Sequence, residues 1–543
     1  MTDKVSENIR KQPRFRGIAV DPERMAGSRT RSSAPGKSDE ALSVEALLLP
    51  ENNGKSTRTL EQNVTAYTGA VNAVAVNAES AALHLAIRLA AEKLYGQAEV
   101  RSFKSSASSL LKGRRVFCQD LAPVALADAI LYEKGEPVFV DVAPEDWCMD
   151  PQALEEAFLH YPDVRIVMMY HMNGFPGQVL HIRDICREHG ALLIEDAGGA
   201  LGAKVWASTG VADESGFGLQ KQEGKAWPDK ADSSNGRGDR FQSEERENIA
   251  LNSEPTNAWR HIGTIGDYGV IGFHGDNPVG DVGGGMLLTK DAAEADRARK
   301  LAGLGNDTDS AEGEVPWQQI EEIRFDYRMN ELQAELICRR LRKVDSYINK
   351  KKFIYERYAK RLDTDAGLME VNPIGEGTAP GYCRTAMTVE SGCLWEDPEA
   401  EDAGKADRSF PSGHGTVSSM EVRGLGLGET DGTVLSRHGT TSPMEIQEAL
   451  EAFGVRVSLI DRPLHMQPLF RGCDQISLDG SIREDGDGQD DGLFIRCNES
   501  ARIFHTGLYL PCELSMTSEE QERIMDIIYA CFDGAEIDRQ AWM

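Results

Sequence analysis

Between residues 73 and 290, short apolar runs alternate with longer amphipathic stretches. The runs are nearly continuous in apolar residues, which is typical of strands buried on both faces of a parallel sheet. The stretches between them hold apolar side chains at helical spacing. We therefore predict an α/β protein with a mostly parallel central sheet covered by helices on both faces, and with ligands at the carboxyl ends of the strands. The predicted strands are 73–76, 115–118, 137–142, 166–169, 191–194, 269–273 and 285–289.

Polar tracts divide the chain into three predicted parts. Residues 1–60 form a polar N-terminal segment, residues 61–345 the large α/β domain, and residues 346–543 a smaller α+β C-terminal domain. One long amphipathic helix is predicted over 329–362. Three further tracts consist mostly of polar residues and glycine, so they cannot bury enough apolar surface to form a core and are predicted to be solvated insertions. These insertions are residues 205–260, 374–442 and 479–492.

The charge of the chain limits its possible partners. It holds 59 Lys and Arg against 88 Asp and Glu, a formal net charge of −29. Such a charge repels nucleic-acid phosphates and anionic membranes, so neither is expected as the main partner. An anionic small molecule would need a local positive pocket.

The cysteines and the N-terminus bear on the cellular location and on metal binding. The ten cysteines include no CxxC pair and mostly lie in apolar segments, so neither a disulfide framework nor a zinc site is expected. The N-terminus has no apolar core of a signal peptide, and no run of 18 apolar residues occurs in the chain. A cytoplasmic protein is the simplest expectation.

A series of motifs in fixed order carries more specific information. They are AVNAVAVNAESAALHLAI, GRRVFCQDLAPVALADAI, PVFVDVAPEDWCMDP, LLIEDAGGALGA, GTIGDYGVIGFHGDNPVGDVGGGML, FDYRMNE, PLHMQP and GLYLP. This order resembles the DegT/DnrJ/EryC1/StrS family of PLP-dependent sugar aminotransferases, over about residues 60–532. The resemblance implies the aspartate-aminotransferase fold (fold type I), PLP as cofactor, a nucleotide-sugar ligand, a role in polysaccharide biosynthesis, and a homodimer with its sites at the subunit interface.

Three site residues carry over from the family with their roles. Asp196 matches the aspartate that binds the protonated pyridine nitrogen, although a strand-end carboxylate can also simply cap the following turn. Ser80 falls on the helix-opening hydroxyl that binds the phosphate, and it would equally serve as an N-cap. Arg328, in FDYRMNE, is expected to shape the subunit interface or to form an ordinary salt bridge.

Other positions depart from the family pattern. Asn277 stands where the Schiff-base lysine belongs, and an amide can neither form an imine nor act as a base near neutral pH. No lysine lies between His261 and Thr289, so a small shift of the alignment does not supply one. Glu79 replaces a glycine and would meet the phosphate as a like charge. The remaining departures are Gly272 for a phosphate-binding serine, Ala122-Pro123 for a threonine and an aromatic ring-stacker, Gly199 for a polar residue near the ring hydroxyl, and Asp326 for an asparagine.

Three functions remain open from the sequence. The first is an active sugar-nucleotide aminotransferase. The second is a degenerate homologue without PLP catalysis that binds or scaffolds, either as a homodimer or with an active paralogue. The third is a cofactor-independent enzyme that uses the cleft with His274 and Asp196 as acid–base groups, since His274 is the nearest base of suitable pKa. The lost lysine and the altered phosphate and ring contacts favour the second.

Overall fold

The computed structural model describes residues 54–96, 109–208, 257–277, 279–280, 282–304, 323–362, 369–389, 433–434, 442–477, 498–533 and 537–538. All of them belong to one unit of the chain, Leu47–Met543.

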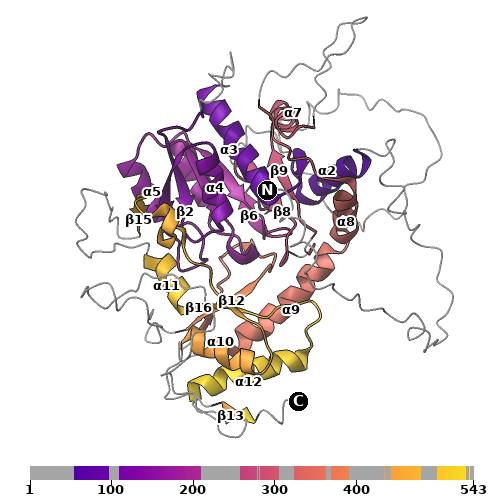
Figure 1. The fold of residues 1–543 in the computed structure, drawn as a ribbon, viewed down its shortest axis with the longest axis vertical. Coiled ribbons are helices and arrows are strands. Elements are labelled where there is room, and N and C mark those ends of the chain that lie inside the picture. The colour runs from indigo at the N-terminus through magenta and orange to yellow at the C-terminus, as the bar shows by residue number, and fades with distance from the viewer. Residues whose placement is uncertain are drawn as a thin grey trace, which may run out of the picture. The chain divides into compact units, whose positions relative to one another are not determined.

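An eight-stranded sheet forms the centre of the large domain (Figure 1). Its spatial order is β1-β9-β8-β5-β4-β2-β3-β15. From β8 to β15 neighbouring strands are parallel, whereas β9 is antiparallel to both β1 and β8. The mostly parallel sheet predicted from the apolar runs is therefore confirmed. The strands are β1 (Asn72–Val76), β2 (Arg115–Gln119), β3 (Glu136–Val140), β4 (Ile166–Tyr170), β5 (Leu192–Asp196), β8 (Tyr268–Gly272), β9 (Gly285–Thr289) and β15 (Gln475–Ile476).

Helices cover both faces of this sheet, as the continuous apolar strands require. One face packs against α3 (Glu79–Tyr95), α4 (Val124–Tyr132) and α7 (Ala292–Leu301). The other packs against α5 (Pro151–His160) and α6 (Val179–Glu188). The helices α2 (Lys55–Thr68) and α8 (Glu331–Leu341) pack on each other beside β1 and β9.

The small domain is an antiparallel four-stranded sheet covered by helices, seen below the large sheet in Figure 1. Its strand order is β10-β12-β16-β14, and α9, α10 and α12 share its apolar core. The elements are α9 (Val344–Leu362), β10 (Met369–Val371), β12 (Thr385–Val389), α10 (Pro443–Ala452), β14 (Ser458–Leu459), α11 (Asn498–Thr506), β16 (Gly507–Leu510) and α12 (Ser518–Asp533). Shorter elements are β6 (Lys204–Ser208), β7 (Asn257–His261), β11 (Thr378–Ala379), β13 (Thr433–Val434), β17 (Ile537–Asp538), and the 3₁₀ turns Met172–Gly174, Leu464–Met466 and Pro468–Phe470.

Several details of the sequence interpretation differ from the structure. The predicted domain bounds do so at two places, since α2 of the large domain begins at Lys55, within the segment 1–60, and β15, within 346–543, joins the large sheet. The predicted helix over 329–362 is two helices, because α8 packs on α2 of the large domain whereas α9 packs on the small sheet, and the chain turns between them. The predicted polar insertions 205–260 and 374–442 are also too long, because both contain strands. The ends of tract 205–260 pair as strands β6 and β7, and the buried strand β12 lies within tract 374–442. The tract 479–492 lies outside the described residues.

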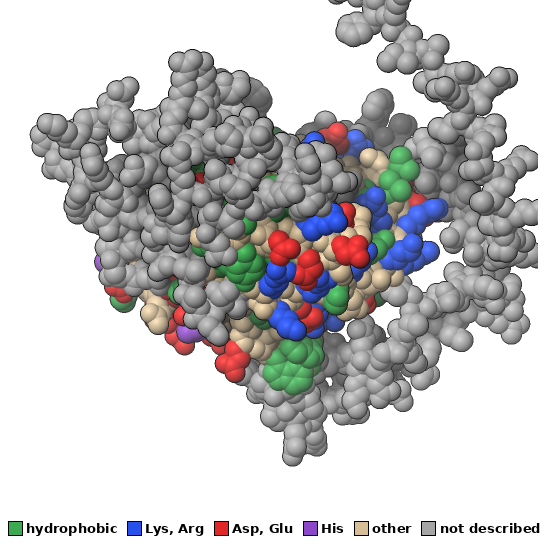
Figure 2. Space-filling view, turned by 90° about the horizontal axis from the view of Figure 1, so that it is seen from below, with side chains coloured by type: hydrophobic (Ala, Val, Ile, Leu, Met, Phe, Trp, Pro, Cys, Tyr) green, Lys and Arg blue, Asp and Glu red, His purple; other side chains and the backbone are tan. Residues whose placement is uncertain are grey.

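The described surface mixes charges of both signs. Seen from below, basic and acidic side chains are interspersed (Figure 2). Ion pairs between helices are part of this pattern, since Arg357 and Arg361 of α9 both bind Glu522 of α12. Within the described residues, no helix is both long and apolar enough to span a membrane.

Candidate functional site

Three segments meet at the carboxyl edge of the large sheet. The strands β5 and β8 are parallel and end there with Asp196 and Gly272. Because β9 is antiparallel to both β8 and β1, the end of β1 and the start of α3 lie at the same edge. The structure thus brings Asp196, Glu79 and His274 together, at the edge where a doubly covered sheet binds its ligands.

Asp196 is fully buried, and only one of its carboxyl oxygens is paired. Oδ1 accepts a hydrogen bond of 2.9 Å from the backbone N–H of Gly198, which is the turn-capping role considered for a strand-end carboxylate. Oδ2 has no hydrogen-bond partner within the described residues. Burial, together with the nearby negative charge of Glu79, raises the pKa of Asp196 well above its ordinary value.

Glu79 fills the space between two glycines. A Cβ atom added to Gly198 would lie 2.0 Å from Glu79 Oε1, and one added to Gly272 would lie 2.0 Å from Glu79 Oε2. Only residues without a side chain therefore leave room for this carboxylate. Glu79 Oε2 also lies 2.7 Å from Nε2 of His274, and this hydrogen bond raises the pKa of the imidazole although burial acts in the opposite direction.

The start of helix α3 differs from the prediction. The helix begins at Glu79 with Ala78 as N-cap, which has no side chain able to cap it. Ser80 therefore lies one residue inside the helix and is not the N-cap. The Glu79 carboxylate lies in the first turn, where the helix dipole stabilises negative charge and where an anionic ligand would otherwise bind.

Asn277 is a structural residue in its loop. Its side chain is 3% exposed, and Nδ2 donates to the backbone oxygens of Gly198 (2.9 Å) and Gly272 (2.8 Å). Its Oδ1 accepts from the backbone N–H of Val279 at 3.0 Å. The amide thereby ties the loop after β8 to the ends of both strands, a task that needs a donor and an acceptor together.

Lys351, from helix α9, approaches this loop from the small domain. It is 6% exposed, and its Nζ donates to the backbone oxygens of Asp276 (2.9 Å) and Cys383. The amine is therefore already bound to the backbone of two segments.

Removing this amine should destabilise the protein. We expect Lys351→Ala to lower the free energy of unfolding by about 2–4 kcal/mol, because the buried carbonyl of Cys383 and the partly buried carbonyl of Asp276 lose a charged donor. Lys352→Ala, at an exposed position of the same helix, is the matched control and should change stability by less than about 0.5 kcal/mol. Urea unfolding of both variants measures the difference. Equal stabilities would contradict the structural role of Lys351.

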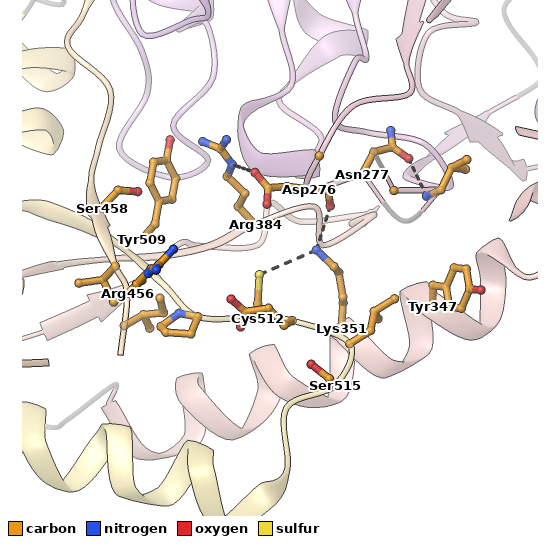
Figure 3. A pocket seen from close by; sticks show the side chains of 18 of the residues that line it. Asp276, Asn277, Tyr347, Lys351, Arg384, Arg456, Ser458, Tyr509, Cys512 and Ser515 are labelled. Atoms are coloured by element: carbon orange, nitrogen blue, oxygen red, sulfur yellow. Dashed lines mark hydrogen bonds and ion pairs between the residues drawn. The ribbon is translucent and has the colours of Figure 1, made fainter. Parts of the chain in front are cut away.

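A pocket of about 770 Å³ lies beside the same loop, between the two domains (Figure 3). Four basic side chains line it, Arg340, Lys351, Arg384 and Arg456, against two acidic ones, Asp276 and Glu513. Figure 3 shows Lys351 and Arg384 converging on Asp276 from different segments. This is the local positive pocket that a chain of net charge −29 needs in order to bind an anion.

Arg384 is paired with two carboxylates at this pocket, Asp276 and, through Nη1 at 3.5 Å, Asp461 Oδ2. Its Nε lies 2.5 Å from Asp276 Oδ2, and its guanidinium lies over the ring of Tyr509 at 4.8 Å. Asp276 is thus already paired. Arg456 is exposed at the pocket wall. Sequence reasoning missed the four basic residues, because they come from separate segments and share no motif.

The other residues carried over from the motifs lie in different surroundings. Arg328 is an exposed side chain whose Nε binds Asp326 Oδ1 at 3.0 Å, which is the ordinary salt bridge considered for it. Pro123 is the N-cap of α4 and Ala122 is buried beside it. A Cβ atom added to Gly199 would lie 3.3 Å from Cys383 Sγ.

Comparison with known proteins identifies the family of the chain. The sequence model of the DegT/DnrJ/EryC1/StrS aminotransferase family matches residues 40–217 and 231–392. The chain belongs to this family. It is 24% identical over 492 residues to the putative pyridoxal phosphate-dependent aminotransferase EpsN of Bacillus subtilis (strain 168), and the match covers 90% of each chain.

A second relative and a solved structure agree with this family. The chain is 26% identical over 263 residues to dTDP-4-dehydro-2,3,6-trideoxy-D-glucose 4-aminotransferase of Saccharopolyspora spinosa, covering 47% of this chain and 54% of that one. It therefore spans about half the length of that enzyme. An aminotransferase from Psychrobacter cryohalolentis has the same fold, with a TM-score of 0.59 and 16% identity over 92% of this chain and 98% of that one. The fold-type I expectation is confirmed.

PLP is the cofactor of this family, and of its contacts to pyridine nitrogen, phosphate and lysine the residues present suit only the first. The unpaired Oδ2 of buried Asp196 is an acceptor of the kind that a pyridinium N–H needs. The Glu79 carboxylate, however, lies at the helix end expected for the phosphate, and Asn277 supplies no amine. These contacts conflict with the family's cofactor.

Proposed function

We propose that this protein is a DegT/DnrJ/EryC1/StrS family member that binds a nucleotide sugar without PLP-dependent transamination. The proposal rests on Asn277, which stands where the family has its Schiff-base lysine. Transamination by this route needs an amine that forms a Schiff base and then moves a proton, and an amide does neither. The hydrogen bonds of Asn277 also use both of its N–H donors and one acceptor site of its oxygen.

The second part of the proposal is the ligand. The family consists of sugar aminotransferases, and one relative is named for a dTDP-linked sugar. A nucleotide sugar carries two phosphates, and the pocket lined by Arg340, Arg384 and Arg456 offers guanidinium groups suited to them. The pocket volume of about 770 Å³ is of the size that holds a small organic ligand.

The absence of PLP chemistry is tested by absorption. Purified protein incubated with PLP should show no visible band that borohydride discharges, and a denatured extract should contain no PLP. A band that borohydride discharges, or transamination of a keto nucleotide sugar, would contradict the proposal and support an active aminotransferase.

Ligand binding is tested by calorimetry. We expect dTDP-glucose to bind saturably, and Arg456→Ala to weaken the affinity about ten-fold, or about 1.4 kcal/mol, because it removes one charged donor. Arg471→Ala, an exposed arginine outside the pocket, is the matched control. Raising the salt concentration should weaken binding to the unmodified protein. No heat of binding, or equal effects of the two substitutions, would contradict the pocket assignment.

A further inference from the structure

Three ionisable side chains lie together at the carboxyl edge of the sheet. Asp196 ends β5, Glu79 begins α3, and His274 follows β8. We propose that Glu79 and His274, backed by Asp196, form a general acid–base dyad that gives the cleft a proton-transfer activity without PLP. The inference rests on the proposed function, because it acts on the nucleotide sugar held in the neighbouring pocket.

The position of Glu79 depends on the glycines at 198 and 272. Its two oxygens lie where side chains at 198 and 272 would otherwise be, and both positions are glycine. Gly272 stands where the family usually has a serine, so the added carboxylate and the missing side chain belong to one arrangement. Random loss of function at separate positions would not be expected to produce such complementary changes.

Asp196 forms the buried end of the group. Asp196 is completely buried and lies close to Glu79, so burial and like charge both disfavour its ionised form and raise its pKa. The outer neighbour of Asp196 is the carboxylate of Glu79, whose Oε2 lies 2.7 Å from Nε2 of His274. A carboxylate behind a histidine fixes the orientation and tautomer of the ring and stabilises its protonated form.

The outer end of the group is open to a ligand. The Nε2 atom of His274 faces Glu79, and its Cδ2 atom is 2.7 Å from the Cβ position of Gly272. The opposite edge, with Nδ1, has no hydrogen bond within the part of the chain that the structure describes, and the side chain is 46% exposed. The charged groups around the ring are Glu79 on α3, Asp276 on its own loop, and Arg384 before β12.

The dyad lies beside the basic pocket. Gly275 and Asp276, which follow His274 directly, line this pocket, and so does Arg384. A ligand whose phosphates bind the arginines would meet Gly275 and Asp276, and the proposal places its sugar toward His274, the residue before them. The histidine can then exchange protons with the sugar.

The chemistry follows from a keto nucleotide sugar, the class to which the dehydro-sugar name of one relative belongs. Nδ1 of neutral His274 takes the proton from the carbon next to the ketone. The electron pair of the broken C–H bond moves onto the carbonyl oxygen as an enolate, and an N–H bond forms on the ring. Return of a proton from the imidazolium to that carbon completes the cycle. Because the imidazolium N–H exchanges with solvent before the proton returns, the net result is hydrogen exchange with solvent at that carbon.

The exchange is measured by proton NMR in D₂O, with dTDP-4-dehydro-6-deoxyglucose as the probe. We expect the unmodified protein to replace hydrogen by deuterium beside the ketone, and His274→Asn to slow this at least about 100-fold, which is the usual contribution of a general base. Arg471→Ala should exchange at the unmodified rate. Probe binding is measured in parallel by calorimetry, and His274→Asn should keep it.

The outcomes separate the two proposals. Binding without exchange overturns the dyad and leaves the proposed function in place. No binding and no exchange contradict both. Exchange that survives in His274→Asn assigns the proton transfer to another group and also overturns the dyad.

A second measurement does not depend on the ligand. Titration of the His274 ring by NMR should give a lower pKa in Glu79→Gln than in the unmodified protein, since the carboxylate that favours the imidazolium is gone. The neutral ring is the base, so the exchange rate should rise as pH passes upward through this pKa. In Glu79→Gln the rise should shift to lower pH. An unchanged midpoint would show that Glu79 does not act through His274.

Discussion

Replacing Glu195 with alanine is expected to lower the free energy of unfolding by about 5 kcal/mol. Glu195 is fully buried and accepts hydrogen bonds from the backbone N–H groups of Gly263 (2.9 Å), Ile265 (2.7 Å) and Gly266 (2.5 Å). It also lies 3.2 Å from Nε2 of His171. Each buried donor left without a partner costs about 1–3 kcal/mol, and three backbone donors would be left at once.

The same residue should make stability depend on pH. Burial raises the pKa of Glu195, but the hydrogen bonds from His171 and the backbone outweigh it, so its pKa lies below the ordinary 4.5. A carboxyl with a lowered pKa in the folded state contributes stability above its unfolded pKa. That contribution is lost as the pH falls through the folded pKa. Glu195→Ala should lose this part of the acid sensitivity.

Urea unfolding at neutral and at acid pH checks both statements. Glu188→Ala, at an exposed position of α6, is the control and should change stability by less than about 0.5 kcal/mol. A loss below about 1 kcal/mol for Glu195→Ala would show that the loop 263–266 does not depend on this carboxylate.

The second large effect expected is a gain of PLP binding. In Asn277→Lys alone, an amine enters the cleft near Asp196, but Glu79 still opposes the phosphate, so only weak adduct formation is expected. Adding Glu79→Gly and Gly272→Ser should tighten PLP binding at least about ten-fold, since the like charge is removed and a hydroxyl donor is added. The serine needs the glycine at 79, because its Cβ would otherwise lie 2.0 Å from Glu79 Oε2.

Visible absorption with borohydride treatment measures the adduct. Asn277→Met in the same background has a side chain of similar length without the amine, and it should form no dischargeable band. If the triple variant also forms none, Asn277 does not occupy the lysine position, and the alignment of this loop is wrong.

The elements of the fold were largely predictable, because the apolar pattern within each segment indicates its own strand or helix. The run 285–289 coincides with β9, and the other predicted strands agree with the structure within one or two residues at most ends. Short strands at the ends of polar tracts were missed, because their stability comes from pairing. Trp206 and Trp259 are partners across β6 and β7, and no local pattern around either indicates the other.

The site could be predicted residue by residue but not as an arrangement. Asp196, Glu79 and His274 each stood out because they match or depart from a motif. Their proximity depends on three strands that end at one edge of the sheet, and these strand ends are far apart in the sequence. Lys351 and Arg384 were not predicted at all, because a single lysine or arginine on a charged segment has no distinguishing pattern.

The edge strand β15 has a consequence for how the chain is made. Residues 475–476 add to the edge of the large sheet, where the backbone N–H groups of Phe139 and Asp141 donate to the oxygens of Asp474 and Ile476. During translation, β3 leaves the ribosome long before these partners exist. Until then the nascent large domain presents an open, apolar strand edge, the kind of surface to which other chains add. We therefore expect a fragment that ends before residue 476 to keep this edge unpaired and to aggregate, rather than to fold as an independent large domain.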